Sequence, residues 1–488
     1  MITLYNTLTK TKERLIPRQD PVKSQSDNGV GKKIQMFVCG PTVYDYIHIG
    51  NARTFVFFDV VAKYLRSPLL RQGSEGQEGY EVDYIQNITD IDDKIIAQAK
   101  ENGRDPLDWA KEYRQKFEED MIALGVDSPR YVPATEHIDQ VVKQVKTLID
   151  KGHAYLIEGD GYYFDLSTFK DYGRLSGRKA QMADDAVSRI DENDKKRNKG
   201  DFCLWKLAKE KGPDPFSEPA WDSELGKGRP GWHIEDTAIT EHFFGPQYDI
   251  HGGGQDLIFP HHEAEITQQE SASGKKPFVK YWMHVAFLIN IDQKMSKSLG
   301  NFETVNELLK KYPKEALRFY LLSGYYRSPL DYSDDLFKQS QAAISRIAEF
   351  IQKLKLVKAD LEAKLPSSIL ESAKKQFTEA MDNDFNTPEA FAAIFEMIRV
   401  INPFLSENNV SEKQAKEILK LLKEIDDITG VIPTEQQKIP AEVQELVKKR
   451  EKLRQDKNYE EADKIRTQIQ VLGWEVEDTI YGPLVIRR

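Results

Sequence analysis

The sequence has 488 residues, of which 40% are hydrophobic and 30% charged, and its formal net charge is −10. This length suits about three domains, the composition is that of a folded protein, and the negative charge excludes binding of polyanions over the whole surface. Two cysteines, Cys39 and Cys203, are too few for a disulfide framework, so a reducing cytoplasm is expected. The first residues lack the apolar block of a signal peptide, and no run of about 18 apolar residues occurs. We therefore expect neither a membrane nor DNA as a partner.

The first third of the chain is predicted to alternate strands and helices. Residues 35–39 and 80–88 read as buried strands, residues 52–65 have helical periodicity between them, and a further helix runs from Asp93 towards Gly103. Strand, helix and strand at this spacing form a βαβ unit, which implies a parallel sheet.

Residues 151–244 are interpreted as an insertion, because strand-like sequence resumes only at residue 248 and again at 285–291. The insertion opens with a predicted hairpin over 154–166 whose two-residue turn is Asp160-Gly161. Helices are expected at 306–322, 337–357, 367–381, 388–405 and 411–428, followed by a basic helix, a helix over 459–471 and a final strand.

Two motifs suit a polyphosphate. His48-Ile49-Gly50-Asn51 lies between a strand and a helix, where unpaired backbone amides attract phosphate and Gly50 permits close approach. His48 and Asn51 can each donate a hydrogen bond to an oxyanion, although a histidine in this place is also a common helix cap. Residues 294–301, KMSKSLGN, follow another predicted strand and provide a flexible cationic loop, unless they are merely a solvated charged loop.

Together these motifs resemble the signatures of class I aminoacyl-tRNA synthetases. Asn51 departs from that pattern, because the family usually has a second histidine there. Asparagine keeps a neutral donor, and loss of a transition-state donor costs about 10²–10³ in rate, so this exchange is expected to affect the rate and not the function.

A metal site is also possible. His261 and Glu265 are four residues apart and share one helical face, and Cys39 would add a thiolate to make a zinc ligand set. Alternatively, HHEAE is an ordinary helix start with ion pairs. HGGG at 251–254 is found in some hydrolases, but no G-x-S-x-G follows, so that interpretation is weak.

The chain closely resembles the cysteinyl-tRNA synthetase family from about Leu4 to its C-terminus. The matching stretches are CGPTVYDYIHIGN, NITDIDDKI, DFCLWK, GRPGWHIE, DIHGGGQDLIFPHHEAE, YWMH, KMSKSLGN, EALRFYLLSGYYRSPLDYS and DNDFNTPEA.

The resemblance implies an α/β fold. A Rossmann-type parallel-sheet catalytic domain (residues 1–150 and 245–305) is split by a connective insertion (151–244). A stem-contact linker (306–345), a helical bundle (346–435) and a C-terminal anticodon-recognition domain (436–488) follow.

The resemblance further implies that L-cysteine and ATP form cysteinyl-adenylate and pyrophosphate, and that the cysteinyl group then passes to the 3′ end of cysteine tRNA. One zinc ion per subunit would bind the substrate thiolate, with ligands at Cys39, Asp236, His261 and Glu265. The family usually has cysteine where this chain has Asp236, so either Asp236 completes the site or the metal keeps three protein ligands and a water. A thiolate binds zinc far better than a hydroxyl does, so no editing site against serine is expected.

The same matching assigns the remaining site residues. Thr89 and Trp232 would line the cysteine pocket with Cys39, the catalytic group would be His48, Asn51, Lys294 and Lys297, and magnesium would accompany ATP. The ATP-binding residues would be Gly40, Thr42, His48, Gly50, Asn51, Gly252, Gly253, Gly254, Asp256, Lys294, Met295, Ser296, Lys297 and Ser298. Cys203 is expected in the core.

Residues 442–466 carry a cluster of cations that suits a phosphate backbone: Lys448, Lys449, Arg450, Lys452, Arg454, Lys457, Lys464 and Arg466. Trp474 either stacks on an anticodon base or belongs to the core. The resemblance places anticodon recognition here and the acceptor end near the insertion. Two alternatives stay open: a ligase that transfers adenylated cysteine to an amine in mycothiol-type biosynthesis, and a non-catalytic, metal-stabilised RNA-binding relative.

Overall fold

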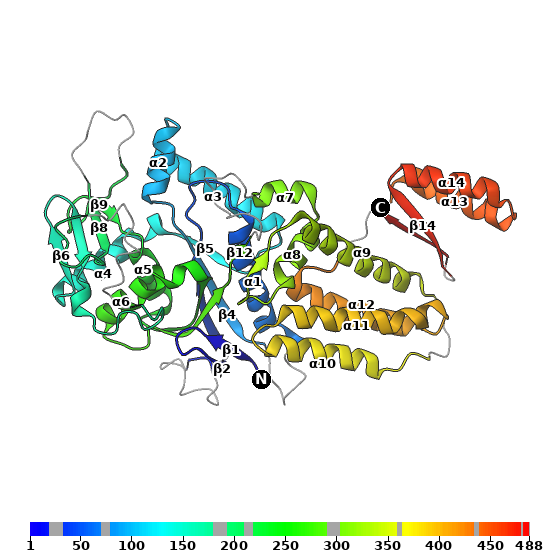
Figure 1. The fold of residues 1–488 in the computed structure, drawn as a ribbon, viewed down its shortest axis with the longest axis horizontal. Helices are drawn as coiled ribbons and strands as arrows, with labels where there is room; N and C mark the ends of the chain where they lie inside the picture. The colour runs from blue at the N-terminus through cyan, green and yellow to red at the C-terminus, as the bar shows by residue number, and fades with distance from the viewer. Residues whose placement is uncertain are drawn as a thin grey trace. The chain divides into compact units, whose positions relative to one another are not determined.

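The computed structural model of the chain describes residues 1–18, 33–69, 79–178, 193–208, 218–289, 303–358, 364–433, 439–479 and 482–487. They form two compact units (Figure 1). The first contains Met1–Lys311, Gly324–Tyr332 and Asp382–Phe385, and the second contains Tyr312–Ser323, Ser333–Met381 and Asn386–Arg488. The finer division into five parts stays a prediction. Within the described chain, no helix has both the length and the apolar character that crossing a bilayer requires.

The first unit is built around a five-stranded sheet in the order β11-β10-β3-β4-β5, and every neighbouring pair is parallel. Counted along the chain, this order is 5-4-1-2-3, the arrangement of a Rossmann-type sheet. The predicted α/β fold is therefore confirmed. The bounds are β3 Lys33–Val38, β4 Glu81–Ile88, β5 Arg130–Pro133, β10 Tyr248–Gly254 and β11 Val279–Val285.

Helices cover both faces of this sheet. Successive strand residues point to opposite faces, and the two glycines of β10 show which helices lie there. A Cβ on Gly252 would meet the ring of Phe58 in α1 (Ile49–Arg66), and a Cβ on Gly253 would meet the imidazole of His262 in α6 (His261–Ser273). Both α1 and α6 are buried along most of their length, although α6 consists largely of polar residues.

The other helices and strands of this unit connect or flank the sheet. They are β1 Thr3–Asn6, β2 Thr11–Arg14, α2 Asp93–Glu101, α3 Pro106–Ala123, α4 Ile138–Asp150, α5 Ile234–Phe244, β12 Leu288–Ile289, α7 Val305–Lys311 and β13 Leu330–Asp331. Residues of α4, α5 and α6 share one hydrophobic cluster with Phe37 and Ile85 of the sheet.

The predicted insertion contains a four-stranded antiparallel sheet, β6 Ala154–Ile157, β7 Gly161–Phe164, β8 Cys203–Leu207 and β9 Gly228–Pro230. The hairpin between β6 and β7 is confirmed, but its turn was predicted wrongly. Gly161 pairs with Ile157 as part of β7, and the left-handed residue that the turn needs is Gly159, with φ of +76°. The turn therefore covers residues 158–160.

Two predicted elements around residue 300 are also corrected. The parallel strand expected at 285–291 is β11, Val279–Val285, and only the two-residue strand β12 lies within the predicted range. The single helix expected at 306–322 is two helices, α7 and α8 (Lys314–Ser323), and Pro313 stands between them. Proline lacks the backbone N–H that a continuous helix requires, which explains the break.

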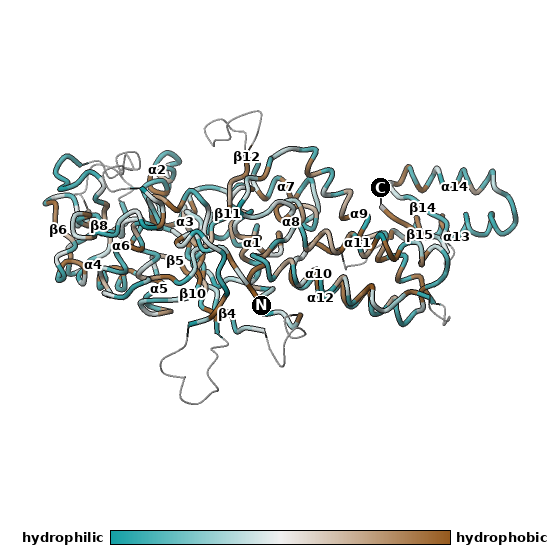
Figure 2. Tube along the Cα trace, turned by 60° about the horizontal axis from the view of Figure 1, so that its bottom comes forward, coloured by the Kyte–Doolittle hydropathy of each residue, from teal (hydrophilic) through white to brown (hydrophobic). Residues whose placement is uncertain are grey.

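The second unit begins with α8 and continues with α9 Asp334–Leu356, α10 Ser368–Asp382, α11 Thr387–Ser406 and α12 Glu412–Thr429. It ends with α13 Ala441–Gln455, α14 Tyr459–Val471 and an antiparallel pair, β14 Trp474–Thr479 and β15 Gly482–Arg487. Hydrophilic colours prevail along α13 and α14, in agreement with their charged sequence (Figure 2).

Two residues of this C-terminal part have structural roles. Trp474 is only 6% exposed and packs with Val443, Ile469 and Val476, which agrees with the second of its two predicted roles, a core residue. Arg450 is 1% exposed and donates to both oxygens of Asp478, at 2.7 and 2.8 Å. It therefore joins α13 to β14 and is not one of the surface cations.

Candidate active site and metal centre

A cavity of about 330 Å³ opens at the carboxyl ends of strands β3, β4, β10 and β11, and we call it the main cavity. Its walls come from the residues that follow β3, from the end of β4, and from the residues that follow β10 and β11. In sheets of this topology, ligands bind outside the carboxyl ends of the strands, where the strand order reverses. The lining includes Cys39, Gly40, Thr42, His48, Gly50, Asn51, Asn87, Thr89, Lys94, Trp232, Asp236, Gly254, Asp256 and His261.

Four residues predicted as metal ligands converge at the inner end of this cavity. Cys39, Asp236, His261 and Glu265 each offer one donor atom, and these four atoms lie within 4.8 Å of one another. Asp236 Oδ2 is 3.2 Å from Cys39 Sγ and 2.9 Å from His261 Nε2, and Glu265 Oε1 is 3.1 Å from the same nitrogen. The donors come from three elements that are distant in sequence: the end of β3, α5 and α6.

Without a cation, this cluster is electrostatically unfavourable. Burial together with the charges of Asp236 and Glu265 raises the pKa of the Cys39 thiol well above its usual value. Burial and the charge of Asp236 likewise raise the pKa of Glu265. Glu265 Oε2 is buried and lacks a hydrogen-bond partner among the described residues. A divalent cation would offset these costs, because it stabilises thiolate and carboxylate together.

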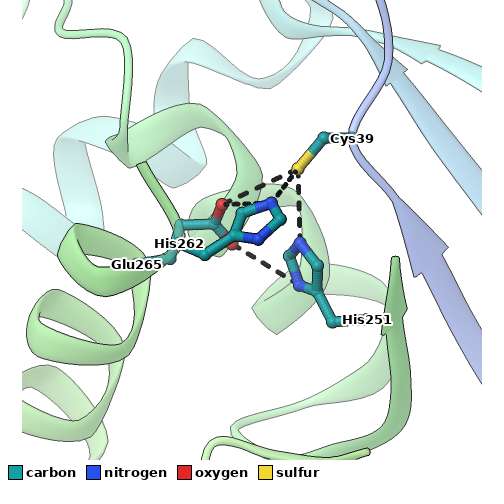
Figure 3. A group of neighbouring side chains, drawn as sticks. All are labelled: Cys39, His251, His262 and Glu265. Carbon is teal, nitrogen blue, oxygen red and sulfur yellow. Dashed lines mark hydrogen bonds and ion pairs between the residues drawn. The ribbon is translucent and has the colours of Figure 1, made fainter. Parts of the chain in front are cut away.

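Figure 3 shows a second group of donors around the same sulfur: His251 and His262, with Glu265. His251 Nε2 is 3.2 Å and His262 Nε2 is 3.1 Å from Cys39 Sγ. Burial lowers the pKa of both imidazoles, so both are neutral at pH 7 and carry one proton each. The position of that proton decides whether they serve as ligands or as hydrogen-bond donors.

The contacts behind the two imidazoles are compatible with a proton on Nε2, and His251 Nδ1 also lies 3.5 Å from Glu265 Oε2. The hydroxyl of Tyr248 lies 2.5 Å from His251 Nδ1 and can donate to it. Thr7 Oγ1 is 2.8 Å from His284 Nδ1, and His284 Nε2 is 2.8 Å from His262 Nδ1. A hydroxyl donor at Thr7 makes His284 a donor to His262. Both His251 and His262 then donate Nε2–H to the sulfur of Cys39, which stabilises its thiolate.

In His261 the roles of the two ring nitrogens are reversed, so that Nε2 and not Nδ1 is the nitrogen without a proton. His261 Nε2 faces the two carboxylates, and its Nδ1 lies 2.8 Å from Nδ1 of His233. Burial lowers the pKa of His233, which keeps it neutral and able to accept. A proton on His261 Nδ1 leaves Nε2 as a lone-pair donor for a metal.

The predicted nucleotide motif lies at the start of α1. His48 is the N-cap residue, and its Nδ1 accepts from the backbone N–H of Asn51 at 3.3 Å. An accepting Nδ1 requires the proton to be on Nε2. His48 is therefore a helix cap and, through the other nitrogen, a hydrogen-bond donor. Asn51 is exposed, and both residues line the main cavity.

The remaining predicted ATP residues divide into three groups. Gly40, Thr42, Gly50, Gly254 and Asp256 line the main cavity. Gly252 and Gly253 are buried behind it, packed against Phe58 and His262, and are not part of its lining. The residues of the KMSKS motif, Lys294, Met295, Ser296, Lys297 and Ser298, lie outside the described residues.

The chain on either side of that motif is nevertheless fixed at the cavity. Phe287 and Leu288, which precede it, line the main cavity. After it, the backbone N–H of Ile49 donates to the carbonyl of Glu303 at 3.2 Å, and His48 forms a β-bridge with Thr304. The described residues before the motif therefore line the main cavity, and those after it lie beside the start of α1.

Thr89 and Trp232, predicted for the cysteine pocket, border the metal cluster. The ring of Trp232 stacks on that of His261 with centroids 4.4 Å apart, and the tryptophan is 40% exposed. The hydroxyl of Thr89 donates to Glu235 Oε2 at 2.9 Å. Burial and the charge of Asp236 raise the pKa of Glu235, and its Oε1 is buried without a partner in the described part of the chain.

A smaller cavity of about 220 Å³, which we call the side cavity, adjoins the main one. Thr42, Lys94 and Trp232 line both, so they form the partition between them. The side cavity reaches the insertion, where Lys196, Lys206 and Arg229 line it. Cys203 lies on its wall and packs with Tyr155, Ile157 and Tyr163, as expected for a core cysteine.

Sequence reasoning missed several residues of the site. Asn87 and Lys94 lie within the stretch NITDIDDKI but had no assigned role, and the same holds for Glu235, His251 and His262. One signal was available for Asn87. It lies two residues before Thr89 at the end of a predicted strand, so both side chains had to point to the same face.

The sequence matches three family models. A class I tRNA synthetase (C) catalytic domain covers residues 25–342, a DALR domain covers 376–432, and a cysteinyl-tRNA ligase anticodon binding domain covers 436–479. Cysteine–tRNA ligases from Carboxydothermus hydrogenoformans and Clostridioides difficile are 42% and 41% identical to it, and each match covers 98% of both chains. The enzyme from Thermococcus onnurineus is 41% identical over 99% of this chain and 98% of its own.

Solved structures show the same fold at low identity. The Mycobacterium tuberculosis methionyl-tRNA synthetase with methionyl-adenylate has a TM-score of 0.57 at 15% identity, over 82% of this chain and 92% of its own. The Agrobacterium radiobacter LeuRS–tRNA–LeuAMS complex has a TM-score of 0.59 at 11% identity, over 86% and 85%. With full-length relatives above 40% identity and the family's own anticodon-binding domain, the chain belongs to the cysteine–tRNA ligase family of class I aminoacyl-tRNA synthetases.

Proposed function

We propose that the main cavity joins L-cysteine to ATP and that a zinc ion at its inner end selects the substrate through its sulfur. One observation carries this proposal. The four donors of Cys39, Asp236, His261 and Glu265 meet within 4.8 Å, and the first three of these residues line the same cavity as the nucleotide motif at the start of α1. A sulfur-binding site and a phosphate-binding site thus share one cavity, which suits the two ends of an aminoacyl-adenylate.

Zinc fits the donor set better than a harder cation. The set offers one thiolate, one imidazole and two carboxylates, and zinc accepts all three ligand types at similar distances, whereas magnesium and calcium prefer oxygen alone. Bound there, the ion would hold the cysteine sulfur as a thiolate. Serine offers only a hydroxyl, so the same bond would be far weaker. One zinc ion per subunit is therefore expected.

Of the two donor groups around Cys39, the one with Asp236 and His261 is the better candidate for the ligand set. Both residues line the main cavity, where a substrate sulfur can arrive. His251 and His262 are fully buried, and their Nε2 atoms serve as hydrogen-bond donors to the thiolate. A site that binds substrate needs an accessible position, which the buried pair does not offer.

ATP would bind with its phosphates at the start of α1. The helix N-terminus offers unpaired amides, Gly50 allows close approach, and His48 and Asn51 donate from its first turn. Gly254 and Asp256 would approach the adenosine, and Gly40 and Thr42 line the same cavity. Lys294 and Lys297, assigned by the family pattern, would balance charge on the triphosphate with magnesium. The cysteine carboxylate then attacks the α-phosphorus and pyrophosphate leaves.

The side cavity is the natural place for the 3′ end of cysteine tRNA. It shares Thr42, Lys94 and Trp232 with the main cavity, so a ribose hydroxyl bound there would lie next to the place proposed for the adenylate. Lys196 on its wall would offer positive charge to a phosphate of the acceptor strand, whereas Lys206 and Arg229 are paired with Asp160 and with Asp93 and Glu218. The anticodon would be recognised by the C-terminal domain, in agreement with the domain match there.

Two assays test this proposal. Cysteine-dependent ATP–pyrophosphate exchange tests activation, and esterification of cysteine tRNA tests transfer. Exchange without tRNA charging would favour a ligase that acts on a small amine. Absence of exchange in the metal-loaded protein would contradict both enzyme readings.

The two cysteines provide a matched pair for the metal. Cys39→Ser should abolish stoichiometric zinc binding, whereas Cys203→Ser, equally buried but outside the cluster, should retain it. Asp236→Ala decides between the two ligand readings. Loss of zinc affinity supports Asp236 as a ligand, and an unchanged affinity would show that water completes the site.

A further inference from the structure

Asn87 occupies a central position beside the metal cluster. It lies at the end of β4 and is 2% exposed. Its side chain contacts the backbone next to Cys39 and the carboxylate of Asp236, and both of these residues are proposed ligands. Its Oδ1 accepts from the backbone N–H of Gly40, directly after Cys39, at 2.6 Å. Because a backbone N–H can only donate, the facing atom of Asn87 must be its oxygen. The amide orientation is therefore fixed, and Nδ2 points the other way.

Nδ2 of Asn87 points at Asp236. It donates to Oδ1 of that carboxylate at 2.6 Å, and its only other described contact is a long one, 3.4 Å to Thr89 Oγ1. The second carboxylate oxygen, Oδ2, faces Cys39 Sγ at 3.2 Å and His261 Nε2 at 2.9 Å. One oxygen is thus held by the amide, and the other is directed at the donor cluster.

We propose that Asn87 is a positioning residue that makes Asp236 a one-oxygen ligand of the metal. This inference rests on the metal site proposed above and adds a requirement that is peculiar to a carboxylate. A thiolate has a single donor atom and needs no such control. A carboxylate has two, and it can rotate or bind through both oxygens. Asn87 occupies Oδ1 and leaves only Oδ2.

The consequence concerns the substrate. If Asp236 bound through both oxygens, it would take a coordination position that the cysteine sulfur needs. Hydrogen bonds from the surroundings of a metal typically change its affinity by about 10–100-fold. The Asn87 amide would therefore contribute to metal affinity and would also keep one position open for the substrate.

A double-mutant cycle isolates this interaction. The zinc dissociation constants of the full-length wild type, Asn87→Ala, Asp236→Cys and the double variant are measured by competition with a chelator. With Asp236 present, Asn87→Ala should raise the zinc dissociation constant by about 10–100-fold. In the Asp236→Cys background, the same substitution should raise it by less than about 3-fold. The lost contact with Gly40 is common to both backgrounds, so it cancels. An equal effect in both backgrounds, or none in either, overturns the inference.

A second variant tests the donor alone. Asn87→Asp has the same shape and retains an acceptor for Gly40, but it places a carboxylate oxygen against Asp236 Oδ1. Its zinc affinity should fall at least as far as that of Asn87→Ala, and an affinity equal to that of the wild type overturns the inference. With cobalt in place of zinc, the visible bands of Asn87→Ala should weaken as the coordination number rises.

The two levels of the proposal fail in different ways. If the wild type takes up no stoichiometric zinc, or Asp236→Ala binds it unchanged, the proposed metal site or its Asp236 ligand is wrong. If the wild type and Asp236→Ala behave as expected but the cycle shows no coupling, only the role of Asn87 is wrong.

Discussion

The buried imidazole of His284 makes the stability of the first unit sensitive to mild acid. It is 3% exposed, and burial lowers its pKa from 6.5 to about 3. The pKa in the folded state is thus below that in the unfolded state. The stability that follows is complete above about pH 6.5 and is lost as the pH falls towards 3, because over that range only the unfolded chain binds the proton.

The size of this effect follows from the same two pKa values. Below pH 6.5 the free energy of unfolding falls by about 1.4 kcal/mol for each pH unit. Going from pH 7 to pH 5 therefore costs about 2 kcal/mol from His284 alone. His233, His251 and His262 also have lowered pKa values, so the wild type should lose more in total.

The variant His284→Gln isolates the contribution of one imidazole. Unfolding in urea, at pH 7 and pH 5 with excess chelator, can be followed by the fluorescence of Trp282, whose ring stacks on that of His284. The loss of stability between the two pH values should be about 2 kcal/mol smaller in the variant. The exposed His242→Gln serves as the control and should behave as the wild type. A difference below about 0.5 kcal/mol between His284→Gln and the wild type would refute the reasoning.

Three further outcomes are expected. In Gly40→Ala the new Cβ would stand 1.7 Å from the carbonyl oxygen of Asn87. The ends of β3 and β4 must then separate, so zinc affinity should fall at least about tenfold. An unchanged affinity in chelator competition would contradict this. Arg450→Lys removes the bidentate hydrogen bond to Asp478 and should speed hydrogen exchange in α13 and β14. The control Lys452→Arg on the same helix should leave the exchange rates unchanged. Trp474→Ala should destabilise the C-terminal domain by about 3–5 kcal/mol. Trp474→Phe should leave the KM for tRNA unchanged. A raised KM in a stable Trp474→Phe protein would instead favour base stacking.

Much of the fold followed from local patterns. The strand at 35–39 and the helix at 52–65 were expected because their apolar residues have the right periods, and both occur within a few residues of the prediction. The strand Val279–Val285 was predicted too far along the chain because its sequence, VKYWMHV, alternates poorly and the apolar run AFLINI follows it directly. The division between α7 and α8 was also missed, although Pro313 was a visible signal.

The candidate site could be predicted only where a motif carried it. Cys39, Asp236, His261 and Glu265 were named from the family pattern, and the fold brings their donor atoms together. The side of the strand on which Asn87 lies could be predicted, but its contact with Asp236 could not, because the two residues are 149 apart and no spacing rule links a strand end to a helix in another segment. The tautomers of His251 and His262 likewise depend on Tyr248, Thr7 and His284, contacts that exist only after folding.

The buried helix α6 limits how this protein can change over evolution. Besides the proposed metal donors His261 and Glu265, it carries Glu263, which accepts from the backbone N–H groups of Leu175 and Ser176, and Glu270, which pairs with Arg174. One helix therefore contributes to the proposed metal site and also contacts the insertion. An insertion borrowed from another synthetase would leave Glu263 buried without these donors and would remove the arginine that pairs with Glu270. The insertion and the amino-acid specificity are thus expected to be inherited together.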